Sequence, residues 1–286
     1  MDKNKRKSIF LMFSTAILWS TGGMMIKLID LNPIAISGYR SIFAVLLISF
    51  FIKKSAFKFT LNKVLGAISY TFMVILYVWA AKETTAANAI LLQYTAPIYV
   101  AVLGMWLLKE KAVARDWIVI VFVIFGMTLF FLDDISPGNM KGNILAILSG
   151  IAMAFNVIFM RKQKDADPLE NVFWGCVLTI LATLPFMILN VPDRQSWVGI
   201  GLLGIFQLGL PYILFSLAIK HITALESTFL GLIEPLLNPL WVFLTIGELP
   251  GPMSILGGIV VLAAVTIGCM KPKKPLAPEL FQEHGS

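Results

Sequence analysis

The sequence predicts an all-α integral membrane protein, with ten transmembrane helices arranged as two inverted-topology five-helix repeats. Three observations lead to this fold class. Hydrophobic residues make up 58% of the chain, charged residues only 14%, and the mean hydropathy is +0.84, whereas soluble domains are about a quarter charged. The middle of the chain is similar to its end. Finally, lysine and arginine gather in alternate connections between apolar runs.

The internal duplication becomes visible when the sequence is shifted by 138 positions. Residues 65–110 then lie on residues 203–248 without a gap, and 11 of the 46 positions are identical. Chance would give roughly three or four identities in such a composition, so a duplicated unit is the better explanation. Each copy holds five spans, and this odd number makes the second copy cross the membrane in the opposite direction. Inverted repeats around a central site are typical of secondary transporters.

Ten apolar runs follow one another, each suited to a membrane span of about 20 residues. We expect spans at 8–28, 33–52, 64–81, 87–108, 116–132, 142–160, 169–190, 197–219, 225–246 and 253–270. A polar, turn-rich link at 133–139 separates the fifth span from the sixth. We therefore expect a first repeat at 1–134, a second at 135–270 and a polar tail at 271–286. The connections between spans are too short for a soluble domain.

The charges in these connections predict the orientation of the chain. On the face of the amino terminus lie Lys3, Lys5, Arg6, Lys7, Lys53, Lys54, Lys58, Lys63, Lys109, Lys111, Arg115, Arg161, Lys162, Lys164, Lys220, Lys271, Lys273 and Lys274. The opposite face carries Lys27, Lys82, Lys141 and Arg194. Cytoplasmic loops are rich in lysine and arginine. We therefore expect both termini in the cytoplasm and a multi-pass protein of the cell (plasma or inner) membrane.

Composition and motifs disfavour several other classes of protein. The net charge of +7 would suggest nucleic-acid binding in a soluble protein, but here it belongs to the cytoplasmic loops. Cys176 and Cys269 lie in apolar runs and indicate neither a disulfide framework nor a metal site. The two histidines, His221 and His284, form no recognisable catalytic pattern with a nucleophile or a metal. We expect no enzyme activity, no cofactor, no metal and no nucleic-acid partner.

Two charged residues lie inside spans, where each costs about 2.5–3.5 kcal/mol and needs a reason. Glu234 is near the middle of its span, and its repeat partner is Ala96, whereas the adjoining Pro97 and Pro235 match. A carboxyl buried there is a candidate proton acceptor or cation contact, and the alternative is a neutral carboxyl that bonds backbone freed by Pro235. Arg40 needs an anion, carbonyls or water. It either receives a substrate carboxylate or pins neighbouring helices.

Uncharged polar and aromatic side chains complete the candidate site. Buried amides and hydroxyls need partners or water, so we expect several of them to line a wet central cavity. The expected substrate-binding residues are Trp19, Ser20, Arg40, Tyr77, Trp79, Gln93, Tyr94, Asn156, Gln207, Tyr212, Glu234 and Asn238. Glu234 is the expected proton-coupling residue. Pro97 and Pro235, one in each repeat, are expected to act as hinges, the alternative being static kinks.

Several local motifs occur in order along residues 8–270. They are Ala-Ile-Leu-Trp-Ser at 16–20, Tyr39-Arg40, Glu234-Pro235, and the glutamates that close the fourth and ninth spans, Glu110 and Glu248. Together with the repeat, these motifs resemble the drug/metabolite transporter superfamily, specifically its EamA-type permeases. One departure is Ala-Phe-Asn at 154–156, where that family commonly has a tryptophan. The resemblance implies transport of amino acids, drugs or other metabolites, mostly outward in bacteria.

The sequence as a whole favours an alternating-access carrier for small amphipathic metabolites such as amino acids or for organic cations, and the resemblance implies that it is an exporter. The bilayer, the small-molecule substrate and protons are the expected partners, and the oligomeric state stays open. A channel-like facilitator is an alternative, although channels favour charge rings and this chain has a single central carboxylate. A membrane-embedded enzyme is the other alternative, and it would alter the compound that it handles.

Overall fold

The computed structural model describes residues 3–52, 60–84, 86–130, 132, 139–237, 241 and 251–269, and these residues are helical with short connections and no strand. The predicted all-α membrane fold class is confirmed. In chain order the elements are α1 (Lys3–Trp19), α2 (Gly22–Leu28), α3 (Pro33–Ser49), α4 (Leu61–Glu83), α5 (Ala86–Gln93), α6 (Ala96–Leu107), α7 (Ala114–Phe130), α8 (Met140–Lys162), α9 (Leu169–Leu189), α10 (Arg194–Leu202), the π-helix η2 (Leu203–Gly209), α11 (Leu210–Ala218), α12 (Ala224–Gly231) and α14 (Pro252–Cys269).

Six helical stretches of the described chain are long and apolar enough to cross a membrane. They are Leu61–Glu83, Asn88–Leu107, Met140–Lys162, Leu169–Leu189, Arg194–Ala218 and Pro252–Cys269. The shorter Pro33–Ser49 is also apolar. The expected boundary between repeats at residues 134 and 135 lies outside the described residues.

Polar residues in the connections fix where several helices begin. The side chains of Asn32, Thr60, Asn139, Asp193 and Thr223 accept hydrogen bonds from backbone N–H groups of the helix that follows each of them. These N–H groups have no partner inside the first turn, so a side-chain oxygen satisfies them. The caps thus explain why apolar runs that differ little in composition start as helices at defined positions.

Four of the expected continuous spans are interrupted. The first breaks between α1 and α2, where Ser20 and Thr21 bond carbonyls of their own turn at 2.6 and 2.8 Å, which competes with the helix ladder. The fourth breaks between α5 and α6, ahead of Pro97. The eighth widens into η2 ahead of Pro211, since proline cannot donate a helix bond. The ninth is interrupted at Leu232, and residues 233–237 resume the helix.

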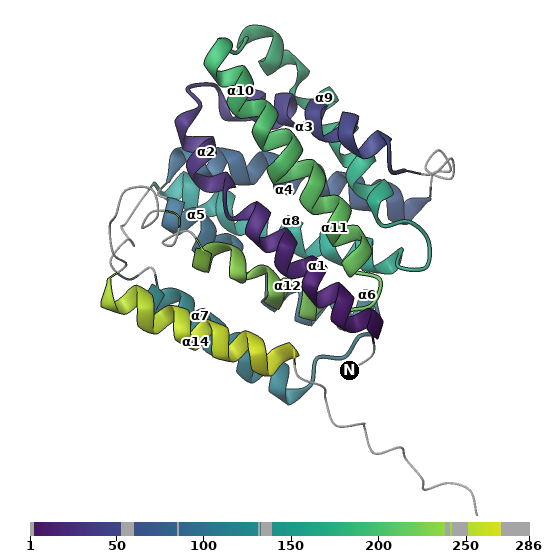
Figure 1. Cartoon of the computed structure of the whole chain (residues 1–286), viewed down its shortest axis with the longest axis vertical. Coiled ribbons are helices and arrows are strands. Elements are labelled where there is room, and N and C mark those ends of the chain that lie inside the picture. Colours follow the sequence, from purple (N-terminus) through teal and green to yellow (C-terminus); the bar gives the residue numbers. More distant parts are fainter. Residues whose placement is uncertain are drawn as a thin grey trace, which may run out of the picture.

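Helices that the 138-residue shift makes equivalent pack on one another in equivalent ways (Figure 1). In the first repeat α4 packs on α8 and α9 of the second, and the equivalent η2 and α11 pack on α3 and α1 of the first. α3 packs on its equivalent α9, and α7 packs on its equivalent α14. Lys82 at the end of α4 donates to the carbonyl of Ile29 at 2.7 Å, and its repeat partner Lys220 donates to that of Ala166 at 3.4 Å. The duplication is therefore visible in the contacts as well as in the sequence.

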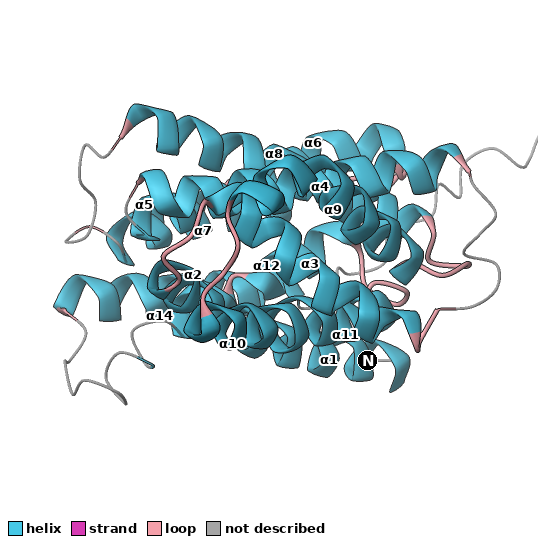
Figure 2. Ribbon diagram, turned by 90° about the horizontal axis from the view of Figure 1, so that it is seen from above, coloured by secondary structure: helices cyan, strands magenta, loops and turns pink. Residues whose placement is uncertain are grey.

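α7 and α14 form a separate pair at one side of the bundle, side by side in Figure 1 and seen from above in Figure 2. Glycines allow their close approach: a Cβ atom at Gly257 would lie 2.5 Å from the carbonyl oxygen of Gly126 and 2.3 Å from the backbone nitrogen of Phe130. Small residues commonly serve this purpose between membrane helices. The pair contacts the rest of the bundle mainly through α6 and α12.

One ion-pair network ties together the ends of four spans. Arg161 at the end of α8 donates to Glu110 at 2.7 Å, and to the carbonyls of Ile219 and Lys220 at 2.8 and 3.0 Å. The second carboxylate oxygen of Glu110 accepts the N–H of Ala224, the first residue of α12, at 3.1 Å. The α6–α7 connection, α8, α11 and α12 thus meet at one end of the bundle.

Candidate functional site

A central cavity lies where the interrupted spans of the two repeats meet. The end of α1, the end of α5, the π-helix η2 and the segment after α12 all reach it. Interrupted helices supply the substrate sites of many transporters because their breaks expose backbone groups at membrane depth. The lining residues are Trp19, Arg40, Met73, Val74, Tyr77, Gln93, Met153, Gln207, Leu208, Tyr212 and Glu234.

Arg40 supplies the positive charge of the cavity. It comes from α3, is only 2% exposed, and its Nη1 donates to Oε1 of Gln207 at 3.1 Å. Gln207 packs closely against α2 at Gly22, where a Cβ atom would lie 2.6 Å from its Nε2. The Nε atom of Arg40 has no hydrogen-bond partner in the described part of the chain. A neutral amide leaves the guanidinium charge uncompensated, so it can receive an anion.

Glu234 supplies the carboxyl group, and Tyr94 holds it. The hydroxyl of Tyr94 lies 2.6 Å from Oε2 of Glu234 and 2.9 Å from the carbonyl oxygen of Gly231. Tyr94 belongs to the break of the fourth span and Glu234 follows the break of the ninth. The contact therefore joins the equivalent interruptions of the two repeats. Because a phenol carries one hydrogen, Tyr94 can donate to only one of these two acceptors at a time.

Aromatic rings form an apolar wall of the cavity. Trp19 meets Tyr212 and Phe215 edge to face, with ring centroids 5.3 and 5.7 Å apart. Tyr212 also meets Tyr70 at 5.2 Å. Tyr77 lines the same space and is 8% exposed. Such ring pairs hold one another in place, and their faces attract cations as well as apolar groups.

The expected site residues divide into three groups. Trp19, Arg40, Tyr77, Gln93, Gln207, Tyr212 and Glu234 line the cavity, and Tyr94 supports it through Glu234. Ser20, Trp79 and Asn156 are not among its lining residues. Asn238 lies outside the described residues.

The residues away from the cavity have other contacts. Ser20 accepts a hydrogen bond from Nε1 of Trp241 at 2.8 Å. Trp79 donates to Glu83 at 2.9 Å, and Lys141 lies 4.8 Å above its ring, so it stands at the end of α4. Asn156 is 1% exposed, and its Oδ1 has no hydrogen-bond partner among the residues described.

Sequence reasoning missed four apolar lining residues, Met73, Val74, Met153 and Leu208. Apolar residues fill every span, so nothing in their type marks them. Met73 is the one whose polar neighbours, Ser149 and Gln93, could have pointed to it from the sequence. Ser149 accepts from Nε2 of Gln93 at 2.8 Å and donates to the carbonyl of Met73 at 3.0 Å, which fixes the edge of the cavity. Thioethers adapt to ligands of varied shape.

The arrangement suits a small amphipathic ligand. A carboxylate can pair with Arg40, an ammonium group can pair with Glu234, and an apolar portion can rest on Trp19 and Tyr212. No group of three or more His, Cys, Asp and Glu side chains in the described ranges is placed to hold a metal ion.

Comparisons with known proteins agree with this geometry. The profile of the EamA-like transporter family matches residues 6–132 and again 140–268. An uncharacterized transporter of Archaeoglobus fulgidus is 28% identical over 205 residues, which cover 71% of this chain and 74% of that protein. The human solute carrier family 35 member G1 is 24% identical over 231 residues, covering 70% and 62%. A solved crystal structure with 14% identity superposes on 92% of this chain and 97% of its own with a TM-score of 0.79, which shows the shared fold.

Proposed function

Because the chain belongs to the EamA-like transporter family, we propose that it is an alternating-access secondary transporter of small amphipathic metabolites. The central cavity carries this proposal. It lies between two repeats of opposite direction and takes its lining from both, for example Arg40 and Tyr77 from the first and Gln207 and Glu234 from the second. A site at the interface of inverted repeats can be exposed to either side when one repeat rocks against the other.

The charges of the cavity favour a zwitterion such as an amino acid. Arg40 and Glu234 offer one group of each sign, and the aromatic wall suits an apolar side chain. An organic cation is the second substrate class, because Glu234 and the rings of Trp19 and Tyr77 suit a cationic group as well.

Glu234 is the proposed proton-coupling residue. When the carboxyl is ionised, the hydroxyl of Tyr94 donates to it at the 2.6 Å contact. When it is protonated, its own hydrogen can point to Tyr94, whose hydrogen then turns to the carbonyl of Gly231 at 2.9 Å. The carboxyl of Glu234 is hydrogen-bonded in both charge states, so it can bind and release a proton without leaving a buried polar group unsatisfied. On protonation, the hydroxyl of Tyr94 therefore stops donating to Glu234 and donates to the carbonyl of Gly231, beside the break of the ninth span.

The proposed setting is the cell membrane with both termini in the cytoplasm. It follows from the lysines and arginines of the connections, most of which lie on the face of the amino terminus. In this orientation Arg161 and Glu110 lie at the cytoplasmic end and Lys82 at the outer end. Export is the proposed direction.

Counterflow in proteoliposomes tests the proposal. Vesicles loaded with an unlabelled compound are diluted into a trace of the labelled one, using a panel of zwitterionic amino acids and organic cations. A carrier gives transient accumulation of label, and the compound is recovered chemically unchanged. Flux that equilibrates without accumulation would support a channel-like facilitator instead, and chemical conversion would support an enzyme. Protein-free vesicles and a large excess of unlabelled compound are the controls.

A further inference from the structure

Two glutamine side chains line the central cavity, and their neighbours fix which end of each amide is left for a ligand. Gln93 comes from the end of α5 and is 8% exposed, and Gln207 comes from η2 and is 7% exposed. A terminal amide has a donor end and an acceptor end of similar shape. Its orientation therefore decides whether it offers a ligand N–H groups or a carbonyl oxygen.

The hydroxyl of Ser149 decides the orientation of Gln93. Ser149 lies on α8 and is 0% exposed, and its Oγ is 2.8 Å from the side-chain amide of Gln93 and 3.0 Å from the carbonyl oxygen of Met73. A backbone carbonyl cannot donate, so the one hydrogen of the hydroxyl goes to Met73. The atom of Gln93 that faces Ser149 must then be the donor Nε2. Oε1 of Gln93 is turned away from Ser149 and is left to accept.

Close packing of α8 on the break of the fourth span holds this arrangement. A Cβ atom at Gly150 would lie 2.7 Å from the backbone carbonyl oxygen of Gln93, so α8 comes this near because residue 150 has no side chain. Tyr94 follows Gln93 in the chain, and its hydroxyl lies 2.6 Å from Glu234. One break thus supports two acceptors of the cavity lining, Oε1 of Gln93 and the carboxyl of Glu234.

Arg40 and Gln207 set the opposite polarity. A guanidinium group only donates, so the atom of Gln207 that lies 3.1 Å from Nη1 of Arg40 is the acceptor Oε1. Nη1 is thereby occupied, whereas the buried Nε has no hydrogen-bond partner in the described chain. Nε and Nη2 form the edge of a guanidinium that can bind a planar carboxylate with two parallel bonds. This edge of Arg40 is therefore suited to an acid group.

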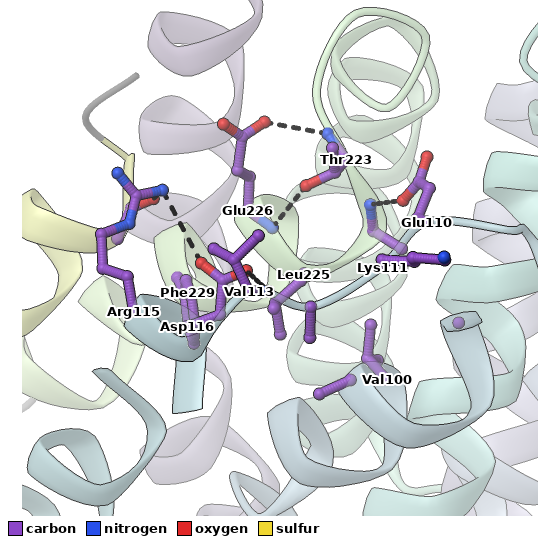
Figure 3. Close-up of a pocket in the computed structure, with 15 residues that line it drawn as sticks. Val100, Glu110, Lys111, Val113, Arg115, Asp116, Thr223, Leu225, Glu226 and Phe229 are labelled. Carbon is purple, nitrogen blue, oxygen red and sulfur yellow. Dashed lines mark hydrogen bonds and ion pairs between the residues drawn. The ribbon is translucent and has the colours of Figure 1, made fainter. Parts of the chain in front are cut away.

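A second cavity, at the ends of α6, α7, α12 and α14 (Figure 3), contains charges but lacks this polarity. Its carboxylates are already paired with cations, as Glu110–Arg161, Asp116–Arg115 and Glu226–Lys5. In the central cavity, by contrast, Arg40 and Glu234 contact the uncharged side chains of Gln207 and Tyr94. Charges that are paired with one another discriminate little between ligands, so it is the central cavity that can distinguish the charged groups of a ligand.

We propose that Gln93, held by Ser149, makes the central cavity selective for a substrate that carries a primary ammonium group as well as a carboxylate. This selectivity rests on the proposed transport function and narrows its substrate class to ammonium acids, away from quaternary organic cations. The ammonium group donates to Oε1 of Gln93 and to Glu234, and the carboxylate accepts from the Nε–Nη2 edge of Arg40. Ser149 is a positioning residue, because it contacts Gln93 and is not part of the cavity lining.

Binding of methylated amino acids tests the proposal without the need for transport. Purified protein in mild detergent is titrated with leucine and phenylalanine, each as the free amino acid and as its N,N,N-trimethyl derivative, and binding is followed by calorimetry. The derivatives keep the carboxylate and the positive charge but have no N–H group. The free amino acids are expected to bind about tenfold more tightly or better, because a site built to bond an N–H group rejects an analogue without one. Equal binding of the two forms, or binding of neither, would overturn the proposal.

Gln93→Met separates hydrogen bonding from the size of the methyl groups. Methionine has a side chain of similar length but no carbonyl, so binding of the free amino acids is expected to weaken about tenfold, the loss of one bond to a charged group. Binding of the trimethyl derivatives is expected to change little. A preference that survives in Gln93→Met would show that size alone excludes the derivatives, and it would overturn the proposal.

Ser149→Ala tests the positioning role. Without an acceptor for Nε2, the amide of Gln93 can turn its N–H groups toward the cavity, and the preference for the free amino acids is expected to fall toward that of Gln93→Met. Ser149→Thr restores the hydroxyl and is expected to restore the preference. Ser227→Ala is the matched control and is expected to keep the preference, since Ser227 is 1% exposed but bonds the carbonyl of Ala224 in its own helix at 2.7 Å. Ser149→Ala and Gln93→Met each carry the test if the other does not fold, and parent-like preference in Ser149→Ala would contradict the positioning role.

Counterflow of the same compounds distinguishes this proposal from the proposed function. Selective binding without counterflow would contradict transport and leave the selectivity of the cavity in place. Counterflow that is equal for the free and the trimethyl forms would keep the carrier and overturn the selectivity.

Discussion

At the scale of single residues, two charged side chains could be found from the sequence because charges are rare inside spans. Arg40 and Glu234 both line the central cavity. Trp79 and Ser20 illustrate the opposite case. They have the residue types expected of a site, yet they bond Glu83 and Trp241 away from the cavity. Depth along a span can be counted from sequence, but the face of the helix on which a residue lies cannot be read when every face is apolar.

Replacing the partner of Arg40 is expected to destabilise the protein. Gln207→Leu removes the carbonyl that accepts from Nη1 at 3.1 Å, and a buried polar group without a partner costs about 1–3 kcal/mol, more when it is charged. A lower midpoint of thermal unfolding in detergent would show this loss. Gln207→Glu is the matched variant, because it restores an acceptor and is expected to retain stability. Equal stability of Gln207→Leu and the parent would contradict this role.

Tyr94→Phe is expected to raise the midpoint of the pH dependence of transport. The hydroxyl stabilises the ionised form of Glu234 more than the protonated form, because bonds to charged groups contribute about 1.5–3 kcal/mol and neutral ones about 1. Without it, Glu234 gives up its proton only at higher pH. The expected rise is about one pH unit, since one unit corresponds to about 1.4 kcal/mol. Counterflow rates across a pH series measure the shift, and Tyr99→Phe, on a tyrosine that lies outside the cavity lining, is the control. An unmoved or lowered midpoint would contradict this role of the Tyr94 hydroxyl.

At the scale of elements, the apolar runs were predicted from the sequence, but the interruptions were only partly so. Pro97 and Pro235 mark two of them in the sequence. The π-helix Leu203–Gly209 was not expected, although Pro211 follows it and cannot donate to the helix ladder. The break after Trp19 depends on how the side chains of Ser20 and Thr21 compete with the helix, and the sequence alone does not decide this competition.

The interruptions are expected to set the rate of transport. In the double variant Pro97→Ala with Pro235→Ala, each new N–H can pair with the carbonyl four residues earlier and favour a continuous helix, by about 1 kcal/mol per bond. Because the two bonds together amount to about 2 kcal/mol, maximal counterflow is expected to slow by up to about thirtyfold, with little change in the concentration that gives half the maximal rate. Pro185→Ala, on a proline inside α9, is the control. A parent-like rate in the double variant would favour static kinks over hinges.

At the scale of the whole molecule, the duplication was the feature that the sequence predicted best. Identities between residues 65–110 and 203–248 correspond to equivalent packing of α4 on α8 and of α11 on α1. The central cavity could also be anticipated, since inverted repeats meet at such a site. The second cavity, which is lined by the ends of α6, α7, α12 and α14, could not be anticipated, because the meeting of these four ends depends on how the α7–α14 pair docks.

The proposed orientation can be checked by labelling single cysteines in intact cells. In a variant with Cys176 and Cys269 replaced by alanine, Asn4→Cys is expected to react with an impermeant maleimide only after the membrane is opened. Gln195→Cys, in the first turn of α10, is expected to react in intact cells. Both residues are exposed in the structure. The reverse pattern would show that the positive charges of the connections do not set the direction of insertion here.

The most direct test of the central claim is the pH dependence of counterflow in the parent and in Glu234→Gln. Glutamine keeps the shape and an acceptor for Tyr94 but cannot titrate. If Glu234 carries the coupled proton, counterflow in the parent changes between mildly acidic and mildly alkaline medium, and Glu234→Gln still exchanges substrate at a rate independent of pH. A variant with the same pH dependence as the parent would contradict the account, because the proton would then be carried by another group and Glu234 would have a structural role.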